Sequence, residues 1–364
     1  MRLLLLTFLP ALFAQDQTGA KYFPFKQINA ANVYQLTQAW IYRTGESLAP
    51  AAKGGRRPAL EVTPLFLNET LYISTPQGRV IAMDPETAKE KWVFDAKINQ
   101  NASYGDFANR GLSHANGRLY LAAIDARLIC LDAKTGRPCV GFQAVDLTKG
   151  LRIPPREAGE YEQTSPPVVV RGVVVVGSAI ADNGRVDMPS GEVRGFDAAT
   201  GALRWTWHPL ETKGVGGANA WSMISADEAA GAVFVPTGSA SPDYYGGNRP
   251  GDNLYANSVV ALDALTGKRL WHFQTVHHDL WDYDVASQPA LFTRRGINAV
   301  AVGSKTGHLF LLNRETGKPL FPVEERPVPS SDAPGEQASP TQPFPTRPAS
   351  LTPVSYTHLP SPRD

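Results

Sequence analysis

Apolar and polar residues alternate in short runs along most of the chain. Clear examples are residues 168 to 179 (VVVRGVVVVGSA), 232 to 239 (AVFVPTGS) and 299 to 313 (AVAVGSKTGHLFLLN). Short runs that are rich in Val, Phe and Leu and bounded by Gly, Pro or Asn are typical of β-strands. The pattern therefore predicts an all-β protein and argues against a solenoid of helices.

One turn sequence recurs five times after such runs. Each copy has Asp or Asn first, Thr three residues later, Gly or Ala at the fourth residue and a large apolar residue at the eighth. The copies begin at Asp84, Asp132, Asp197, Asp263 and Asn313. An Asp side chain can cap its own turn and Gly accepts a positive φ angle, so each copy predicts a β-hairpin.

The eighth residue of each copy predicts how the units pack against one another. These residues are Trp92, Val140, Trp205, Trp271 and Phe321. A bulky side chain at the same place in each unit is expected to form a wedge between stacked neighbours. The copies lie 48 to 66 residues apart, which leaves room for a four-stranded sheet in each interval. We therefore expect a β-propeller with about five blades present.

The ends of the chain differ in composition from this repeat region. Residues 1 to 14 (MRLLLLTFLPALFA) are typical of a secretory signal peptide, which predicts a periplasmic protein. Residues 15 to 321 then form the partial propeller, in which residues 36 to 45 are expected to be the last strand of a blade. Residues 322 to 364 are expected to be a Pro-rich loop, and the tail after residue 353 resembles a foreign sequence.

Charge and cysteine content narrow the function only slightly. The 35 basic and 34 acidic residues give a net charge of +1, so no global field favours nucleic acid or a membrane surface. Cys130 and Cys139 flank the second turn and fit either a disulfide or two unpaired core cysteines. Because no Cys-x-x-Cys occurs, the chain encodes neither a haem attachment site nor a zinc ribbon.

The densest group of ionisable and aromatic residues is TVHHDLWDYD, residues 275 to 284. His277 and His278 are adjacent, so on a strand they point to opposite faces and are poor ligands for one metal. Asp282 follows Trp281, and a carboxylate beside an aromatic wall is a candidate general base. The alternative for Asp282 is a carboxylate that caps a surface turn.

Further candidates lie in other blades, and each has a plain structural alternative. Arg110 is a fixed cation or a salt bridge between blades. Asp182 and Asn183, with Glu61 as a further carboxylate, offer oxygen ligands for calcium, or form an ordinary Asp-Asn-Gly turn. Lys305 sits at a strand end with Gly on either side.

Trp221 lies outside the register of the repeated turns. Its indole is therefore either a stacking platform for a flat ligand or a core side chain.

Taken together, these motifs resemble the pyrroloquinoline quinone (PQQ) dependent dehydrogenases, and most closely their glucose dehydrogenase branch. The motifs are FKQINAANV, EVTP, NRG, YEQTSPP, RGFDAATG, GGNRP, TVHHDLWDYD, SKTGHLFLLN and PTQPFP, in this order between residues 22 and 345. The resemblance implies an eight-bladed propeller with PQQ at its centre beside a divalent cation, usually calcium. It also implies oxidation of an aldose or polyol, with electrons passed to a membrane quinone.

The resemblance assigns a role to each candidate residue. Asp282 resembles the base that takes the substrate hydroxyl proton, and Lys305 resembles the cation hydrogen-bonded to the quinone oxygens. Trp221 resembles the platform under the cofactor. The other matched positions are Glu61, Arg110 and Thr164 at the cofactor, and Asp182 and Asn183 at the metal.

Two departures from the family pattern concern the substrate. A third concerns how much of the propeller ring is present. Alcohol-oxidising relatives carry adjacent cysteines where this chain has Tyr104 and Gly105, which weakens an alcohol dehydrogenase interpretation. Ser239 stands where those relatives place an Asn calcium ligand, as a sugar-oxidising branch allows. Five repeats are present where eight are implied. Other interpretations are a non-catalytic scaffold of the cell envelope and a hydrolase, although neither Gly-x-Ser-x-Gly nor His-Glu-x-x-His occurs.

Overall fold

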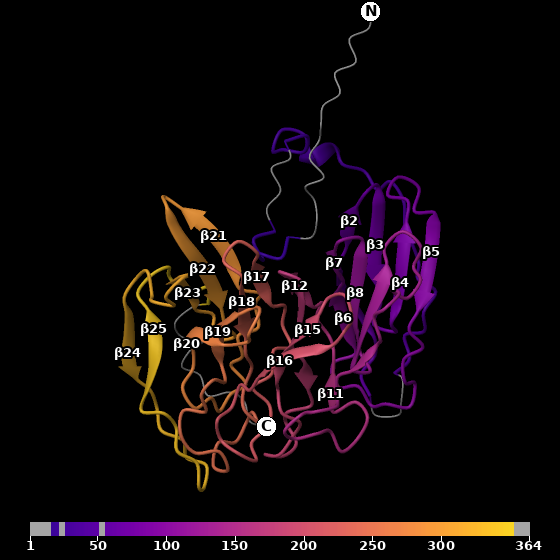
Figure 1. Ribbon diagram of the computed structural model, residues 1–364. Coiled ribbons are helices and arrows are strands. Elements are labelled where there is room, and N and C mark those ends of the chain that lie inside the picture. The colour runs from indigo at the N-terminus through magenta and orange to yellow at the C-terminus, as the bar shows by residue number, and fades with distance from the viewer. Residues whose placement is uncertain (1–15, 22–25, 51–54, 353–364) are drawn as a thin grey trace, which may run out of the picture.

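The protein is built of short antiparallel sheets that stand side by side around a common centre (Figure 1). The computed structural model describes residues 16 to 21, 26 to 50 and 55 to 352. Within these ranges no helix is long and apolar enough to cross a membrane. The expected signal segment and the tail after residue 353 lie outside the described residues.

Four sheets are complete four-stranded blades, and a fifth has three strands. The first blade comprises β2 (Leu65–Leu67), β3 (Thr70–Ser74), β4 (Arg79–Met83) and β5 (Glu90–Asp95). The second comprises β7 (Ser113–Ala115), β8 (Arg118–Ala123), β9 (Arg127–Asp132) and β10 (Val145–Asp146). The third comprises β12 (Val168–Val170), β13 (Val173–Val176), β15 (Val193–Asp197) and β16 (Leu203–Trp207).

The fourth blade comprises β17 (Ser225–Asp227), β18 (Ala232–Pro236), β19 (Ser258–Asp263) and β20 (Arg269–Gln274). The fifth sheet comprises β21 (Ala290–Arg294), β22 (Ile297–Gly303) and β23 (Leu309–Asn313). Short elements outside these sheets are η1 (Val33–Gln35), the parallel pair β1 (Ala59–Thr63) and β6 (Ala108–Gly111), and the pair β11 (Tyr161–Glu162) and β14 (Ala179–Ile180). The architecture confirms the predicted β-propeller with five blades.

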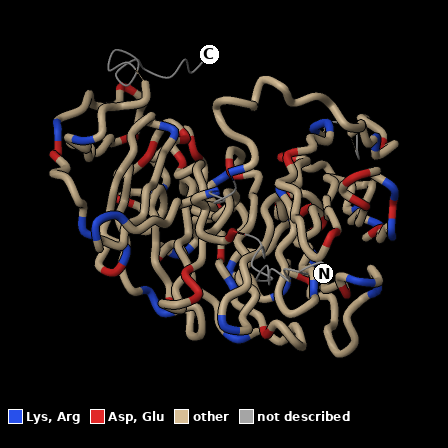
Figure 2. Tube along the Cα trace, turned by 90° about the horizontal axis from the view of Figure 1, so that it is seen from above, with Lys and Arg blue, Asp and Glu red and all other residues tan. Residues whose placement is uncertain are grey.

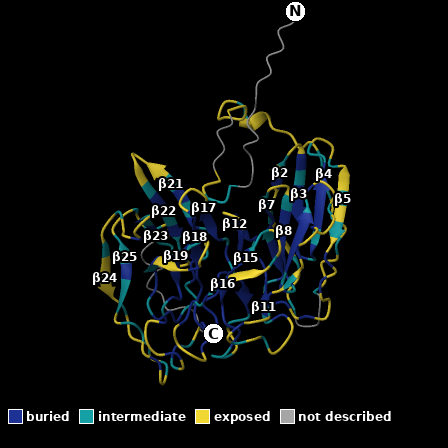
Figure 3. Cartoon of the chain, in the orientation of Figure 1, coloured by how far each residue is buried: buried dark blue, intermediate teal, exposed yellow. Residues whose placement is uncertain are grey.

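Charge and burial follow the blade pattern. Lys and Arg residues are interspersed with Asp and Glu across the view from above, as the net charge of +1 implies (Figure 2). The middle strands of each blade are buried, whereas the outer strand β5 is largely exposed (Figure 3). The core is therefore formed where the faces of neighbouring blades meet.

The repeated turn adopts the predicted conformation. In the fourth blade Asp263 Oδ1 accepts hydrogen bonds from Thr266 N at 2.8 Å and Thr266 Oγ1 at 2.7 Å, and Gly267 has a φ angle of +71°. The other four copies have the same pair of Thr-to-Asp or Thr-to-Asn bonds. Even Ala88, which replaces Gly in the first copy, has a positive φ of 56°. In the four complete blades the turn joins the third strand to the fourth, and in the fifth sheet it follows the third strand.

The predicted wedge is confirmed for the three tryptophans of this register. Each indole donates a hydrogen bond from Nε1 to a backbone carbonyl in the repeated turn of the next blade. That carbonyl belongs to the residue that follows the first Asp or Asn of the turn. These bonds join Trp92 to Ala133 at 3.1 Å, Trp205 to Ala264 at 2.9 Å and Trp271 to Arg314 at 3.0 Å. The ring also lies on the turn glycine, since a Cβ atom on Gly267 would come within 2.5 Å of Trp205.

The expectation for Val140 is wrong, because its side chain is 94% exposed. A disulfide between Cys130 and Cys139 closes this turn, which settles the alternatives left open for the two cysteines. Tyr120 then supplies the contact to the third blade, since its hydroxyl donates to Ala198 O at 2.7 Å. Phe142 packs against the glycine in the turn of the third blade, in place of an indole.

Residues 36 to 45 do not form a strand, contrary to expectation, since no strand in the described part of the chain pairs with them. The segment nevertheless supplies the wedge for the first blade. Trp40 Nε1 donates to Pro85 O at 3.0 Å, the same contact that the other indoles make. This stretch therefore acts as the edge of a preceding blade without its strand pairing.

Composition favours a loop after residue 321, yet a hairpin of β24 (Val323–Pro327) and β25 (Thr341–Pro345) forms there. Gln342 exchanges two hydrogen bonds with the backbone of His277, at 2.8 and 2.7 Å. Glu336 accepts a bond from Gly246 N at 2.8 Å. These contacts with distant backbone stabilise the hairpin despite its high content of Pro and Ser, and they hold two loops of the fourth blade.

Candidate active site

The candidate residues gather at one end of the propeller because of the way each blade is connected. In a meander of antiparallel strands, the link between the second and third strands and the link to the next blade lie at the same end. The Asp-Thr-Gly turns lie at the other end. The candidates Trp221, Asp282 and Lys305, with the flanking Ser239, all fall in links of the first kind.

The centre of the group is an ion pair of one cation with two carboxylates. Lys305 Nζ lies 2.8 Å from Asp282 Oδ2 and 2.8 Å from Asp284 Oδ2. Asp284 is further fixed by Trp221 Nε1 at 3.0 Å and by Ser239 N at 2.7 Å. Residues from four links are thus held together through Asp284 and Lys305.

Burial and charge give these groups unusual proton affinities. Burial, and then the charge of Asp284, raises the pKa of Asp282 to about 7, although Lys305 opposes the shift. Burial alone would lower the pKa of Lys305, but the Asp284 charge and the bonds to both carboxylates outweigh it and raise that pKa above its usual value. The site therefore pairs a permanent cation with a carboxylate that can gain or lose a proton near neutral pH.

Trp221 lies near both the cation of this ion pair and a second cation. Arg110 Cζ lies 5.2 Å from the centre of the indole ring, and Lys305 Nζ lies 5.8 Å from it. Arg110 is oriented by Glu61 Oε2 at 2.9 Å and Asp106 Oδ2 at 3.1 Å. An aromatic face with two fixed cations suits a flat, negatively charged ligand.

Thr164 joins the same group through its backbone and its side chain. Its carbonyl accepts a bond from Arg110 N at 2.9 Å, and its hydroxyl donates to Trp221 O at 3.2 Å. Thr164 thus fixes the positions of Arg110 and Trp221 relative to each other.

The predicted metal corner is an acidic region beside the ion pair. Burial, followed by the charges of Asp243, Asp284 and Asp282, raises the pKa of Asp182 well above its usual value. Burial also raises the pKa of Asp243 to about 6, and Asp243 Oδ1 is buried with no hydrogen-bond partner among the described residues. Asn183 follows Asp182 but is itself exposed.

An orphaned carboxylate oxygen beside mutually repelling carboxylates suits a cation. In the described part of the chain no three His, Cys, Asp or Glu residues are already arranged as a metal cluster. A cation would therefore have to draw on mixed oxygen donors and on the cofactor as well as on these carboxylates.

Four functional positions had no assigned role in the sequence interpretation. Asp279 Oδ2 accepts bonds from Ser239 Oγ at 2.5 Å and Asn257 Nδ2 at 3.0 Å, which fixes the Ser239 segment. The others are Asp284, Asp243 and Tyr244, whose hydroxyl donates to Asp282 Oδ2 at 3.3 Å. The only sequence signal for Asp279 and Asp284 was the high density of carboxylates in residues 279 to 284, and Asp243 and Tyr244 had no such signal. Their contacts depend on loops distant along the chain.

The two adjacent histidines of this stretch point apart. His278 Nδ1 lies 2.6 Å from Gly251 O, whereas His277 Nε2 lies 3.2 Å from Glu325 Oε1 of the C-terminal hairpin. They serve as loop anchors and lie after β20, not on a strand.

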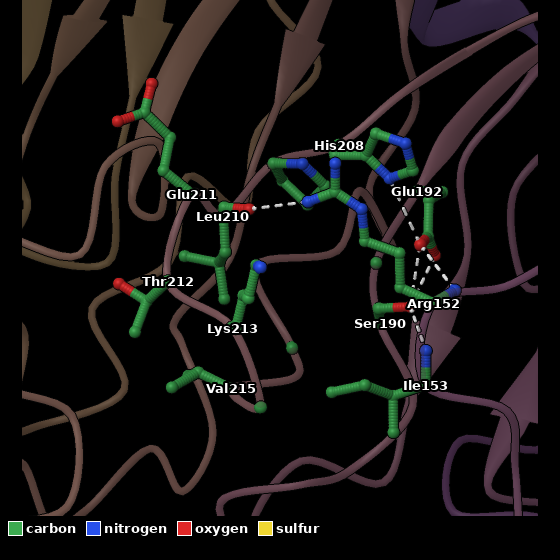
Figure 4. Close-up of a pocket in the computed structure, with 14 residues that line it drawn as sticks. Arg152, Ile153, Ser190, Glu192, His208, Leu210, Glu211, Thr212, Lys213 and Val215 are labelled. Carbon is green, nitrogen blue, oxygen red and sulfur yellow. Dashed lines mark hydrogen bonds and ion pairs between the residues drawn. The ribbon is translucent and has the colours of Figure 1, made fainter.

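A separate cavity of about 430 Å³ is lined by the link before the third blade, the link that leads into β15 and the link that follows β16 (Figure 4). Its wall carries Glu192, which is buried and accepts bonds from Ser190 Oγ at 2.7 Å and Arg152 N at 3.0 Å. His208 Nδ1 lies 3.3 Å from the same carboxylate. The buried carboxylate of Glu192 is thus hydrogen-bonded within the protein, as part of a network that supports the cavity wall. The cavity contains none of the predicted site residues.

Comparison with known proteins gives one consistent family. Residues 11 to 360 match the PQQ family described as "Glucose/ethanol/alcohol dehydrogenase, beta-propeller domain". The chain is 36% identical to the quinoprotein glucose dehydrogenase of Escherichia coli strain K12 over 353 residues, covering 87% of the chain and 44% of the relative. It is also 36% identical to the glycerol dehydrogenase large subunit of Gluconobacter oxydans over 353 residues, covering 88% and 47%.

Solved structures agree with the sequence relatives. The quinohemoprotein alcohol dehydrogenase of Comamonas testosteroni superposes with a TM-score of 0.71 at 27% identity, over 93% of this chain and 52% of that one. The chain thus spans about half the length of the relatives it matches. The shared propeller, the extent of the family match and the identity to curated members lead to one conclusion: this chain belongs to the PQQ-dependent dehydrogenases.

Proposed function

We propose that the protein oxidises an aldose or a polyol with PQQ as cofactor and a divalent cation, calcium, beside it. The observation that carries this proposal is the contact of Lys305 with Asp282 and Asp284 next to the Trp221 ring. PQQ, when bound, supplies the chemistry of hydride acceptance from the carbon that bears the substrate hydroxyl.

The proposed roles follow from the charges and geometry of the residues. Asp282, with a pKa of about 7, takes the proton of the substrate hydroxyl. Lys305, whose pKa is raised, remains a cation and stabilises negative charge that develops nearby in the transition state. Trp221 provides a flat face, and Arg110, oriented by Glu61, provides a fixed positive charge for a cofactor carboxylate.

Asp182 and Asn183, with the orphaned oxygen of Asp243, would hold the cation. A divalent ion there would remove the repulsion between the carboxylates and polarise the bound cofactor. Ser239 is a weak candidate for this role, since its hydroxyl already donates to Asp279.

A sugar or polyol is favoured over a simple alcohol by the loop that holds Arg110. At Tyr104 and Gly105 this loop is held by Glu162, which accepts bonds from Gly105 N and Asp106 N. A buried carboxylate thus holds the positions where the resemblance places adjacent cysteines in the alcohol-oxidising type. The second candidate is an alcohol dehydrogenase, because the chain is also 31% identical to the quinohemoprotein alcohol dehydrogenase ADH IIB of Pseudomonas putida.

We further propose a periplasmic location, as the apolar N-terminal segment indicates. The relatives suggest the class of substrate and the electron acceptor. One relative is the quinate/shikimate dehydrogenase (quinone) of Acinetobacter baylyi, at 35% identity. A membrane quinone is accordingly the proposed electron acceptor, and the protein would work at the membrane surface. No nucleic acid partner is proposed.

The test uses protein expressed from its complete reading frame and reconstituted with PQQ and Ca²⁺. It should reduce an artificial electron acceptor when given an aldose. Asp282→Asn should lower kcat by about 10² to 10⁴, while PQQ uptake, followed by absorbance titration, stays close to that of the unmodified protein. The exposed Asp332→Asn is the matched control. Unchanged turnover in Asp282→Asn would remove Asp282 as the base.

A further inference from the structure

Tyr244 is an exposed aromatic residue that contacts the proposed base. It lies in the link between β18 and β19, at the same end of the propeller as the ion pair. Its side chain is 44% exposed, and its hydroxyl donates to Asp282 Oδ2 at 3.3 Å. That same oxygen lies 2.8 Å from Lys305 Nζ. The phenol therefore stands on the solvent side of the carboxylate that the proposed mechanism uses.

The backbone around Tyr244 is held firmly although the ring is exposed. On its N-terminal side, Pro242 O accepts bonds from Arg249 Nε at 3.1 Å and Nη2 at 3.0 Å, and Arg249 is fully buried. On its C-terminal side, Gly246 N donates to Glu336 at 2.8 Å. A side chain on a loop fixed at both ends can place its polar group accurately for a ligand.

The position of the phenol dictates what it can recognise. The Tyr244 hydroxyl contacts Asp282 from an exposed side chain, so a substrate hydroxyl that approaches Asp282 from this side meets it. The 3.3 Å bond is long, so an arriving hydroxyl can displace it at low cost. The freed phenol then has a hydrogen-bond donor available for a second polar group of the substrate.

We propose that Tyr244 is a specificity residue that binds a second hydroxyl of the substrate, next to the one that is oxidised. The inference rests on the proposed function and deepens it. The site would favour vicinal diols, including sugars and polyols, over monohydric alcohols of the same length.

The test compares glycerol with 1-propanol in the PQQ- and Ca²⁺-loaded protein expressed from its complete reading frame. Tyr244→Phe removes one hydroxyl and should lower kcat/KM for glycerol about five- to tenfold, the range of one neutral hydrogen bond. The loss should appear mainly in KM, and kcat/KM for 1-propanol should not fall. If the protein oxidises glycerol but not 1-propanol, the effect of Tyr244→Phe on KM and kcat for glycerol tests the proposal.

The neighbouring residue provides a matched control. Tyr245 is also a tyrosine of this loop, but its hydroxyl donates to Pro334 O at 2.9 Å and not to Asp282. Tyr245→Phe should leave the glycerol to 1-propanol ratio unchanged. Thermal midpoints and PQQ titrations of both variants separate loss of folding from loss of recognition.

The outcomes are distinguishable. An equal loss on both alcohols, an unchanged KM for glycerol, or the same effect in Tyr245→Phe would overturn the role of Tyr244. Unmodified protein that binds PQQ but oxidises neither aldoses, polyols nor alcohols would instead refute the proposed function.

Discussion

Glu162 offers a direct test of the electrostatics beneath the candidate site. It lies in β11, is 2% exposed, and accepts backbone bonds from Gly105 and from Asp106 at 3.1 Å. Asp106 in turn orients Arg110. Burial raises the pKa of Glu162 to about 7 in spite of these two bonds. We expect Glu162→Gln to change how the stability of the protein depends on pH.

The sign follows from the direction of the shift. Between about pH 4.5, the usual value for Glu, and pH 7 the folded state binds more protons at Glu162 than the unfolded state. Stability contributed by this group is therefore full at pH 4 and falls as the pH rises through 7. A shift of two to three pKa units corresponds to roughly 3 kcal/mol. Gln cannot ionise, so the variant avoids this loss.

The assay is urea denaturation of the unmodified and variant proteins at pH 4 and pH 8. Between the two pH values the difference in free energy of unfolding should move in favour of Glu162→Gln by about 3 kcal/mol. Any bond lost at both pH values cancels in this comparison.

Glu160→Gln is the control with the opposite sign. Glu160 accepts hydrogen bonds from Arg185 Nη1 at 2.7 Å and Nη2 at 3.0 Å, and Arg185 lowers the pKa of Glu160. That variant should lose stability relative to the unmodified protein as the pH rises. A free-energy difference for Glu162→Gln that is the same at pH 4 and pH 8 would refute the argument that burial sets its pKa.

Two further predictions concern the ion pair and the blade interface. Lys305→Met removes the charge that lowers the pKa of Asp282, so the pH at which kcat/KM rises should move upward from about 7 by roughly 1 to 3 units. Lys305→Arg retains the charge and should leave this pH unchanged. A pH–rate profile that does not move in Lys305→Met would contradict the prediction. Gly267→Ala places a Cβ 2.5 Å from Trp205 at a φ of +71°, and should destabilise the protein by about 2 to 4 kcal/mol in thermal denaturation. Ala88→Gly, at the equivalent turn of the first blade, is the control and should change the stability by about 1 kcal/mol or less. If Gly267→Ala does not destabilise the protein, the indole ring moves to accommodate the added Cβ at little cost.

The repeated turn could be predicted from the sequence because it depends on local contacts. An Asp, a Thr three residues later and a residue of positive φ are fixed by bonds within five residues, so the pattern survives wherever it occurs. The prediction for Val140 was wrong because the disulfide from Cys130 to Cys139 overrides the local register of the turn. The C-terminal hairpin was missed because its stability comes from distant loops, through Gln342 and Glu336.

The candidate site was predicted only in part for the same reason. Asp282, Lys305 and Trp221 stand in long, recognisable motifs, and the structure brings them together. The role of Asp284 as the shared acceptor of Lys305 and Trp221 depends on two loops that are 63 and 21 residues away along the chain. Nothing in a local pattern distinguishes it from Asp282, two residues before.

The contact between blades has a direction along the polypeptide. Each indole precedes its acceptor carbonyl in sequence, by 45 residues for Trp40, 41 for Trp92, 59 for Trp205 and 43 for Trp271. On the ribosome, a finished blade therefore presents its tryptophan to solvent until the turn of its successor has been synthesised. Every new blade covers the apolar edge of the one before it, so the order of translation is also the order in which exposed edges are closed.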